Sequence, residues 1–152
     1  MFDDPNVVLH CEKIDKIYPG TKALDQVSFD LLKGKVTVLI GENGAGKSTF
    51  LRLLAGVYRP TEGRIMINGE DVYENPTLKS ELFFIPDEIY QMPGASMDSL
   101  AKIYSSIYPN WSASRYAELV KRFPIPPERK LSACSKGMRR QIAIILGLSC
   151  MP

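Results

Sequence analysis

The stretch "IGENGAGKST" (40–49) carries the residue types that hold phosphate groups. It contains the pattern G-x-x-x-x-G-K-[ST], in which Gly41 and Gly46 are followed by Lys47 and Ser48. Glycines let backbone N–H groups turn inward around phosphate oxygens, and the start of a following helix adds partial positive charge. The motif therefore predicts a nucleoside-triphosphate site. The candidate binding residues are Gly41, Glu42, Asn43, Gly44, Ala45, Gly46, Lys47, Ser48 and Thr49, with Lys47 as a catalytic group and Ser48 as a metal ligand.

The segments on either side of this motif favour the same interpretation. The apolar run 36–40 is typical of a strand that is buried on both faces of a parallel sheet. Apolar residues at helical spacing follow in 47–57, and Gly56 suits the end of that helix. A phosphate loop has to leave a strand and open a helix in this way.

The rest of the chain changes character from strand-rich to helical. Further strands are expected in the ranges 7–14, 21–35, 63–69 and 82–86. Two helical patterns lie in 95–123, each opening on a serine N-cap, and a last helix is expected from about Ser135 to Ser149. The order predicts an α/β core with a helical subdomain.

Composition limits the class of protein. With 152 residues and 45% apolar residues, the chain can bury the core of one domain. A net charge of +2 gives no basis for a nucleic-acid partner. Three cysteines without metal-ligand spacing predict free thiols in a reducing cytoplasm, and no signal peptide or apolar run of about 20 residues is present. We expect a soluble cytoplasmic chain, with a membrane partner left open.

Residues 18–70 resemble the ATP-binding subunit of an ABC transporter along their whole length, in "ALDQVSF", the phosphate loop and "AGVYRPTEGRI". The resemblance implies ATP and Mg²⁺ as cofactors. It also implies a P-loop NTPase (RecA-like) core with an N-terminal antiparallel β part. On this basis the core and β part would span 1–86, the helical subdomain 87–135 and a signature helix 135–149. Tyr18 would stack on adenine, the alternative being simple packing at a strand end.

The family's signature motif corresponds here to Cys134–Met138, where Ser135 and Gly137 would donate to the γ-phosphate of ATP held by an opposite subunit. Lys136 and Met138 depart from the commoner residues. This variant, with "YPNW" (108–111), resembles a bacterial subfamily associated with GntR-type regulators. The alternative is a capped basic helix without a ligand.

Two further positions follow from the resemblance. The family's glutamine that contacts Mg²⁺ and the attacking water corresponds to Asp87, which would be both a catalytic residue and a metal ligand. Gln91, four residues later, could fill the same role through a longer loop. The family's strand ending in Asp-Glu would begin after "SCMP", so we expect the chain to be the N-terminal part of a longer ATPase and to be inactive alone. We also expect the end of the chain to expose apolar residues and therefore either self-association or a disordered, poorly packed tail. The residues concerned are Ile142, Ile144, Ile145, Leu146 and Leu148.

As a whole protein, the resemblance implies an ATPase that drives transport. Its partners would be transmembrane subunits and a second nucleotide-binding subunit, identical or not, at the inner face of the cell membrane. Two other functions stay open: a non-transport ABC ATPase of the translation or DNA-repair type, and a non-catalytic nucleotide-sensing module. A phosphate-loop kinase is disfavoured, because 70–130 offers no acceptor site.

Overall fold

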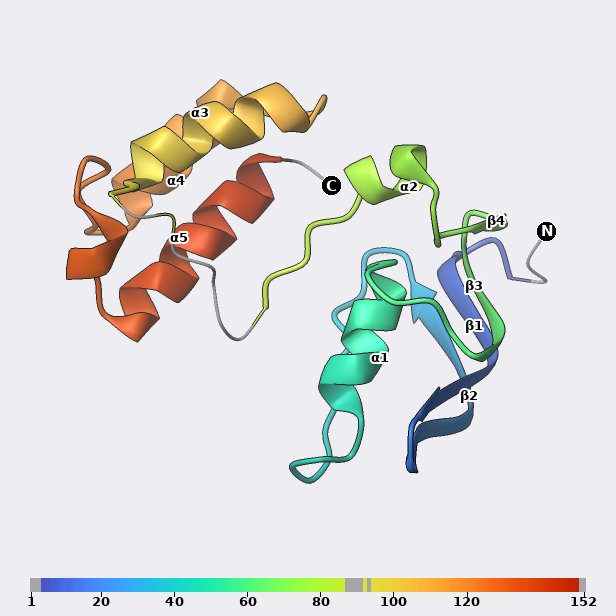
Figure 1. Cartoon of the computed structure of the whole chain (residues 1–152). Coiled ribbons are helices and arrows are strands. Elements are labelled where there is room, and N and C mark those ends of the chain that lie inside the picture. The colour runs from blue at the N-terminus through green and yellow to red at the C-terminus, as the bar shows by residue number, and fades with distance from the viewer. Residues whose placement is uncertain (1–3, 87–91, 93, 151–152) are drawn as a thin grey trace. The chain divides into compact units, whose positions relative to one another are not determined.

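The computed structural model describes residues 4–86, 92 and 94–150. The chain forms two compact units, Met1–Lys79 and Ser80–Pro152. Figure 1 shows strands with the helices α1 and α2 in the first unit, and a group of helices in the second. Each unit has a core of its own and is treated separately below.

A four-stranded antiparallel sheet forms the first unit, in the order β2-β1-β3-β4. Its strands are β1 (Val7–Tyr18), β2 (Thr21–Leu32), β3 (Glu62–Ile67) and β4 (Glu70–Asp71). β1 and β2 form a long hairpin that turns at Gly20, where φ is +80°. On β1, Cys11 and Ile14 have no exposed surface, so the middle of this strand lies at the centre of the sheet's core.

Two helices complete the first unit. Helix α1 (Lys47–Leu54) buries Phe50 and Leu53, and the Phe50 ring packs edge-on against Phe29 of β2. Gly56, with φ of +64°, ends the turn after α1, as the sequence predicts. The short helix α2 (Pro76–Ser80) follows β4.

The run 36–40 was expected as a parallel core strand and the run 82–86 as a further strand, but neither forms a strand, so both predictions are wrong. Residues 36–40 and 82–86 lie outside every strand, and Val36 and Ile40 are 94% and 87% exposed. A strand exists only where neighbouring backbone supplies hydrogen-bond partners. Within the part of the chain that the structure describes, no other segment pairs with either run.

Helices form the second unit: α3 (Met97–Ile107), α4 (Ala113–Arg122), a short 3₁₀ turn (Leu131–Ala133) and α5 (Lys136–Ser149). Each of the three α-helices starts at the serine that the sequence predicts. The side chains of Ser96, Ser112 and Ser135 accept hydrogen bonds from the backbone N–H groups of Ser99, Arg115 and Met138. Such caps satisfy donors that the first turn of a helix leaves unpaired.

The core of the second unit lies between its three helices. Ile142, Ile145 and Leu146 of α5 are buried there against α3 and α4. The expectation that all five apolar residues of α5 are exposed is therefore wrong for these three, because the helical unit itself covers them. Ile144 and Leu148 are 42% and 47% exposed, as expected.

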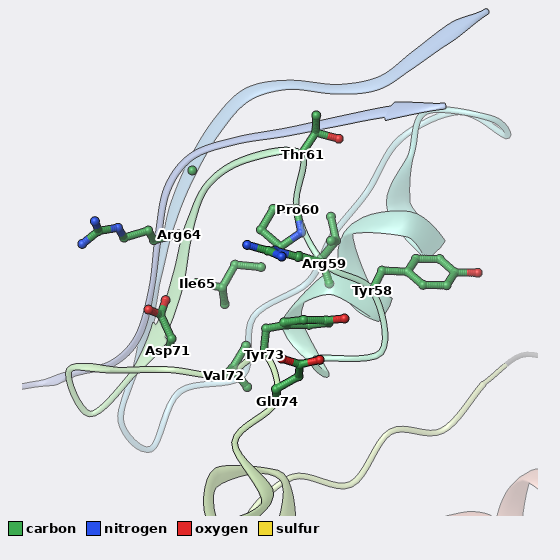
Figure 2. A pocket seen from close by; sticks show the side chains of 12 residues that line it. Tyr58, Arg59, Pro60, Thr61, Arg64, Ile65, Asp71, Val72, Tyr73 and Glu74 are labelled. Carbon is green, nitrogen blue, oxygen red and sulfur yellow. The ribbon is translucent and has the colours of Figure 1, made fainter. Parts of the chain in front are cut away.

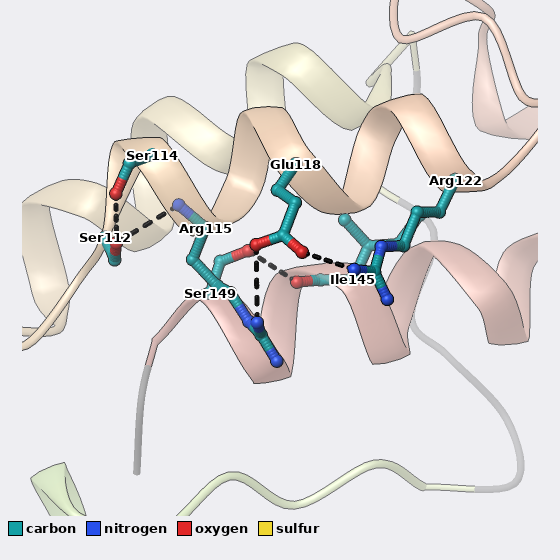
Figure 3. Close-up of polar contacts among 7 residues, drawn as sticks. All are labelled: Ser112, Ser114, Arg115, Glu118, Arg122, Ile145 and Ser149. Atoms are coloured by element: carbon teal, nitrogen blue, oxygen red, sulfur yellow. Dashed lines mark hydrogen bonds and ion pairs between the residues drawn. The ribbon is translucent and has the colours of Figure 1, made fainter.

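Polar contacts fix α4 along α5 (Figure 3). The N–H of Ser112 donates to the carbonyl of Ser149 at 2.8 Å. The buried Ser149 hydroxyl donates to the carbonyl of Ile145 within α5. Along the outer face of α4, Glu118 pairs with Arg115 and Arg122 one turn to either side. The bond from Ser112 to Ser149 joins the beginning of α4 to the end of α5.

Candidate nucleotide-binding site

Left-handed backbone at two glycines shapes the phosphate loop. Gly44 has φ of +88° and Gly46 has φ of +79°, a region that other residues rarely adopt. Gly46 has a second reason to be glycine, because a Cβ there would lie 2.5 Å from the carbonyl oxygen of Ala23 on β2. A Cβ on Gly44 would meet no atom within 4 Å. The loop is therefore packed tightly onto β2 at its helix end and open at Gly44.

Helix α1 begins without a side-chain cap. Its N-cap residue is Gly46, which has no side chain, and the first bond into the helix runs from the N–H of Phe50 to the carbonyl of Gly46. The N–H groups of the first turn, from Lys47 to Thr49, have no acceptor inside the helix. No acidic side chain lies in that turn. This end of α1 thus presents unpaired donors and partial positive charge, which together suit an anion.

The Lys47 side chain bonds back to the phosphate loop that precedes it. Its ammonium donates to the carbonyl oxygens of Gly41 and Glu42, at 2.7 Å and 2.6 Å. An ammonium has three N–H donors, so two of them hold the loop in its curved shape. The N–H of Ala45 also donates to Glu42 and tightens the turn at Asn43. Ser48 is exposed in the first turn of α1, where its hydroxyl can reach a ligand.

Tyr18 lies at the end of the hairpin that supports this loop. It pairs across the strands with Thr21, two residues before Ala23, whose carbonyl packs against Gly46. The Tyr18 side chain is partly exposed, and the ammonium of Lys16 lies 5.3 Å from the centre of its ring. The fold thus brings the hairpin end with Tyr18 and the start of α1 to the same part of the first unit.

Asp15, Lys22 and Asp25 form a network of ion pairs at the same end of the hairpin. Asp15, buried on β1, accepts a hydrogen bond from the N–H of Gln26 at 2.5 Å and forms an ion pair with Lys22 at 2.9 Å. The Gln26 N–H, and then Lys22, hold the pKa of the Asp15 carboxyl below its usual range. Hydrogen bonds to Asp25 and Asp15 raise the pKa of Lys22 to about 12.

Ser135 and Gly137 stand at the start of α5 in the second unit. The Ser135 oxygen accepts from the N–H of Met138 at 3.2 Å, and its hydroxyl proton is still able to donate. Gly137 has no positive φ, and a Cβ there would meet only the Ser135 Oγ, at 3.9 Å. The unit's own packing therefore does not require glycine at this position.

Sequence reasoning overlooked Lys16, whose ammonium contacts the Tyr18 ring. The alternation of a strand puts residues two apart on the same face, and this was the signal that could have found it. Asp87 and Gln91, the two candidates for the position that contacts Mg²⁺, lie outside the described residues. In the part of the chain that the structure describes, no group of three or more His, Cys, Asp or Glu side chains could hold a metal ion.

A pocket of about 400 Å³ lies elsewhere in the first unit, and it is lined by the end of α1 and by residues that follow α1 in the sequence (Figure 2). Buried Leu53, Ile65 and Val72 line it, and the Arg59 guanidinium lies 5.8 Å from the centre of the Tyr73 ring. No residue of the phosphate loop lines this pocket. The phosphate loop is an open cradle of backbone donors and is distinct from it.

The loop runs from Gly41 to a helix without a side-chain cap, and the Lys47 ammonium bonds to the loop carbonyls. This is the phosphate-binding arrangement of P-loop proteins. The sequence profile of the ABC transporter family matches residues 24–152. The chain therefore belongs to the ABC transporter family.

Two curated relatives cover different parts of the chain. It is 55% identical over 69 residues to the ribose import ATP-binding protein RbsA 1 of Agrobacterium fabrum, a region that makes up 45% of this chain and 14% of that protein. It is 27% identical over 145 residues to the ABC transporter ATP-binding protein YtrB of Bacillus subtilis, covering 95% of this chain and 50% of the relative. The chain thus spans half or less of the length of either protein.

The fold agrees with these relationships. A solved structure described as the ATP binding subunit of an ABC transporter superposes with a TM-score of 0.85, at 24% identity, over 95% of this chain and 63% of that one. This likeness shows the P-loop fold of an ABC ATPase domain. None of the helices that the structure describes is both long enough and apolar enough to cross a membrane.

Proposed function

We propose that this chain is part of the ATP-binding subunit of an ABC transporter and that its first unit binds the triphosphate of ATP. The observation that carries the proposal is the start of α1, where a glycine N-cap leaves the first-turn N–H groups unpaired beside the Lys47 ammonium. Every other long helix of the described chain is capped by a serine. The donor set fits an anion with several oxygens.

Each loop residue has a distinct role in this proposal. Backbone N–H groups of Gly44 and of Gly46 to Thr49 surround the phosphate oxygens, and Lys47 turns from the loop carbonyls toward the β- and γ-phosphates. Tyr18 stacks on adenine, which adds modest affinity and tolerates the identity of the base. Ser48 and Asp87 would hold Mg²⁺, which neutralises charge on the phosphates when it is bound.

The second unit is proposed to act on ATP held by another subunit. Ser135 still has a hydroxyl proton to donate, and Gly137 leaves room for a phosphate close to the backbone at the start of a helix. Two ATP molecules would then lie between two nucleotide-binding subunits. The freedom of Gly137 from packing constraints supports this role, because glycine in a helix is otherwise unfavourable.

In the whole protein, we propose that ATP hydrolysis drives transport through transmembrane partner subunits, with this subunit at the cytoplasmic face of the cell membrane. The variant signature at 134–138 and "YPNW" at 108–111 support placement in the subfamily associated with GntR-type regulators. The proposed boundaries are a core and β part in 1–86, a helical subdomain in 87–135 and a signature helix in 135–149.

The test is a titration of the chain with Mg-ATP, comparing the unchanged sequence with Lys47→Ala. We expect the substitution to weaken binding by roughly tenfold or more, because it removes the ammonium that lies on the carbonyls of the phosphate loop. Lys33→Ala removes an equal charge from an exposed turn and serves as the control. An affinity that is unchanged in Lys47→Ala would remove the assignment of the phosphate loop.

A further inference from the structure

The Lys16 side chain joins two separate parts of the first unit. Its Nζ donates to the carbonyl oxygen of Arg59 at 2.8 Å. The same atom lies 5.3 Å from the centre of the Tyr18 ring and 5.9 Å from that of Tyr58. Distances of this size are typical of a cation attracted to an aromatic face. One ammonium therefore connects β1 with the segment that follows α1.

The segment that anchors Lys16 is itself fixed to β1. The N–H of Thr61 donates to the carbonyl of Asp15 at 2.8 Å, and the N–H of Ile17 donates to the Thr61 hydroxyl at 3.1 Å. These bonds flank Lys16 on either side in the sequence. Figure 2 shows residues 58–61 running between α1 and the strands. The carbonyl of Arg59 is thus a fixed acceptor, and the Lys16 ammonium is held in place over Tyr18.

A tyrosine at the end of a strand would otherwise be free to change rotamer. Lys16 and Tyr18 are two residues apart on β1, and the 5.3 Å between the Lys16 ammonium and the centre of the Tyr18 ring shows that the two side chains lie together. Immobilising a free side chain when a ligand binds reduces affinity, whereas a side chain that is already held avoids this loss. A cation over one face of the ring leaves the opposite face for a planar ligand.

We propose that Lys16 is a positioning residue for nucleotide recognition: it holds the Tyr18 ring ready to stack on the base. The proposal rests on the proposed function, in which Tyr18 contacts adenine. Lys16 itself does not touch the nucleotide. Because stacking depends on the base and not on the phosphates, removing the Lys16 ammonium should weaken ATP and GTP binding while binding of inorganic triphosphate stays the same.

The experiment measures the affinity of the full chain for Mg-ATP and for magnesium triphosphate on the same protein sample. In Lys16→Met, which keeps the length of the side chain and removes its charge, we expect ATP binding to weaken roughly threefold to tenfold. Triphosphate binding should change less than twofold. Lys16→Arg should restore ATP binding, since a guanidinium can also lie over the ring. Lys33→Met, beyond the other end of the hairpin, controls for the loss of one positive charge.

A second comparison uses Tyr18→Leu, which removes the ring. In that background Lys16→Met should have no additional effect on ATP binding, because the two residues act as one unit. The ratio of the ATP and triphosphate affinities does not depend on the fraction of protein that is folded, so a partly unfolded variant still gives a result. Three results would overturn the proposal: unchanged ATP affinity in Lys16→Met, an equal loss for triphosphate, or the same loss in the Tyr18→Leu background. Failure of the unchanged chain to bind either ligand would instead overturn the proposed function.

Discussion

A Cβ atom on Gly46 would lie 2.5 Å from the carbonyl oxygen of Ala23, closer than such atoms approach in folded proteins. Because Gly46 has no side chain, the phosphate loop packs directly against the backbone of β2. Both the close approach of Gly46 to Ala23 and the positive φ of Gly46 occur where α1 starts directly against the hairpin of β1 and β2.

The first prediction follows for Gly46→Ala. We expect the first unit to lose roughly 1–3 kcal/mol of stability from backbone strain, with a further loss from the clash. Gly44→Ala is the matched control, because its φ is also positive while its Cβ would meet no atom. Denaturant unfolding of both variants measures the difference. Equal losses would mean that packing against Ala23 contributes nothing.

The second prediction concerns Gly137→Ala, where the opposite effect on stability is expected. Alanine fits the available space and favours the helix, so the variant should be more stable by roughly 0.5–1 kcal/mol. ATP-driven association of two subunits should nonetheless weaken in the full-length protein, since a methyl group would stand where the phosphate approaches. Thermal unfolding and solution mass with Mg-ATP test the two halves of the prediction. Gly147→Ala, whose Cβ would meet the Phe83 ring at 2.6 Å, should destabilise the same helix.

The third prediction uses the buried carboxylate of Asp15. Its pKa is lowered in the folded chain by the Gln26 N–H and then by Lys22. A lowered pKa means that Asp15 stabilises the fold above the carboxyl's ordinary value of 3.8 and that this contribution disappears as the pH falls through the folded value. Asp15→Asn should therefore lower the Tm at pH 7, and the difference from the unchanged chain should shrink in acid. A Tm difference that is constant from pH 7 to pH 2.5 would contradict this account.

The fourth prediction decides between Asp87 and Gln91. If Asp87 occupies the position that contacts Mg²⁺, then Asp87→Gln should keep or raise ATP hydrolysis in the full-length enzyme, because glutamine is the family's residue there. Gln91→Ala should then have little effect. The reverse pattern, with Gln91→Ala abolishing transport-coupled hydrolysis, would move the assignment four residues along the chain.

The fifth prediction concerns a polypeptide of residues 1–152. Its phosphate loop is expected to bind Mg-ATP, while phosphate release stays near background, because hydrolysis needs a carboxylate base within reach of the attacking water. In the family this base is the Glu of an Asp-Glu pair at the end of the apolar strand that follows the signature helix. A polypeptide of residues 1–152 would lack that strand and its Asp-Glu pair. Release of phosphate at rates typical of ATPases, and abolished by Lys47→Ala, would overturn this expectation.

Local patterns in the sequence were sufficient for features that depend on near neighbours. The serine caps of α3, α4 and α5 and the glycines of the phosphate loop each follow from residues a few positions apart. The strand character of 36–40 could not be judged in this way, since it depends on a distant pairing partner. The burial of Ile142 and Ile145 likewise depends on α3 and α4, which no periodicity within α5 reveals.

The apolar run 36–40 leads directly into Gly41, and this has a consequence for how the chain responds to nucleotide. Among the described residues, none of these five takes part in a backbone hydrogen bond, whereas Gly46 at the other end of the loop is packed against Ala23. The Gly41 side of the loop is therefore held by the Lys47 ammonium and not by backbone pairing of residues 36–40. A triphosphate that draws the Lys47 ammonium away from the Gly41 and Glu42 carbonyls has to order this side of the loop itself. The free energy spent on this ordering lowers the observed affinity. ATP would then act as a folding template for the loop, and protection of amides 36–41 from hydrogen exchange should rise when it is added.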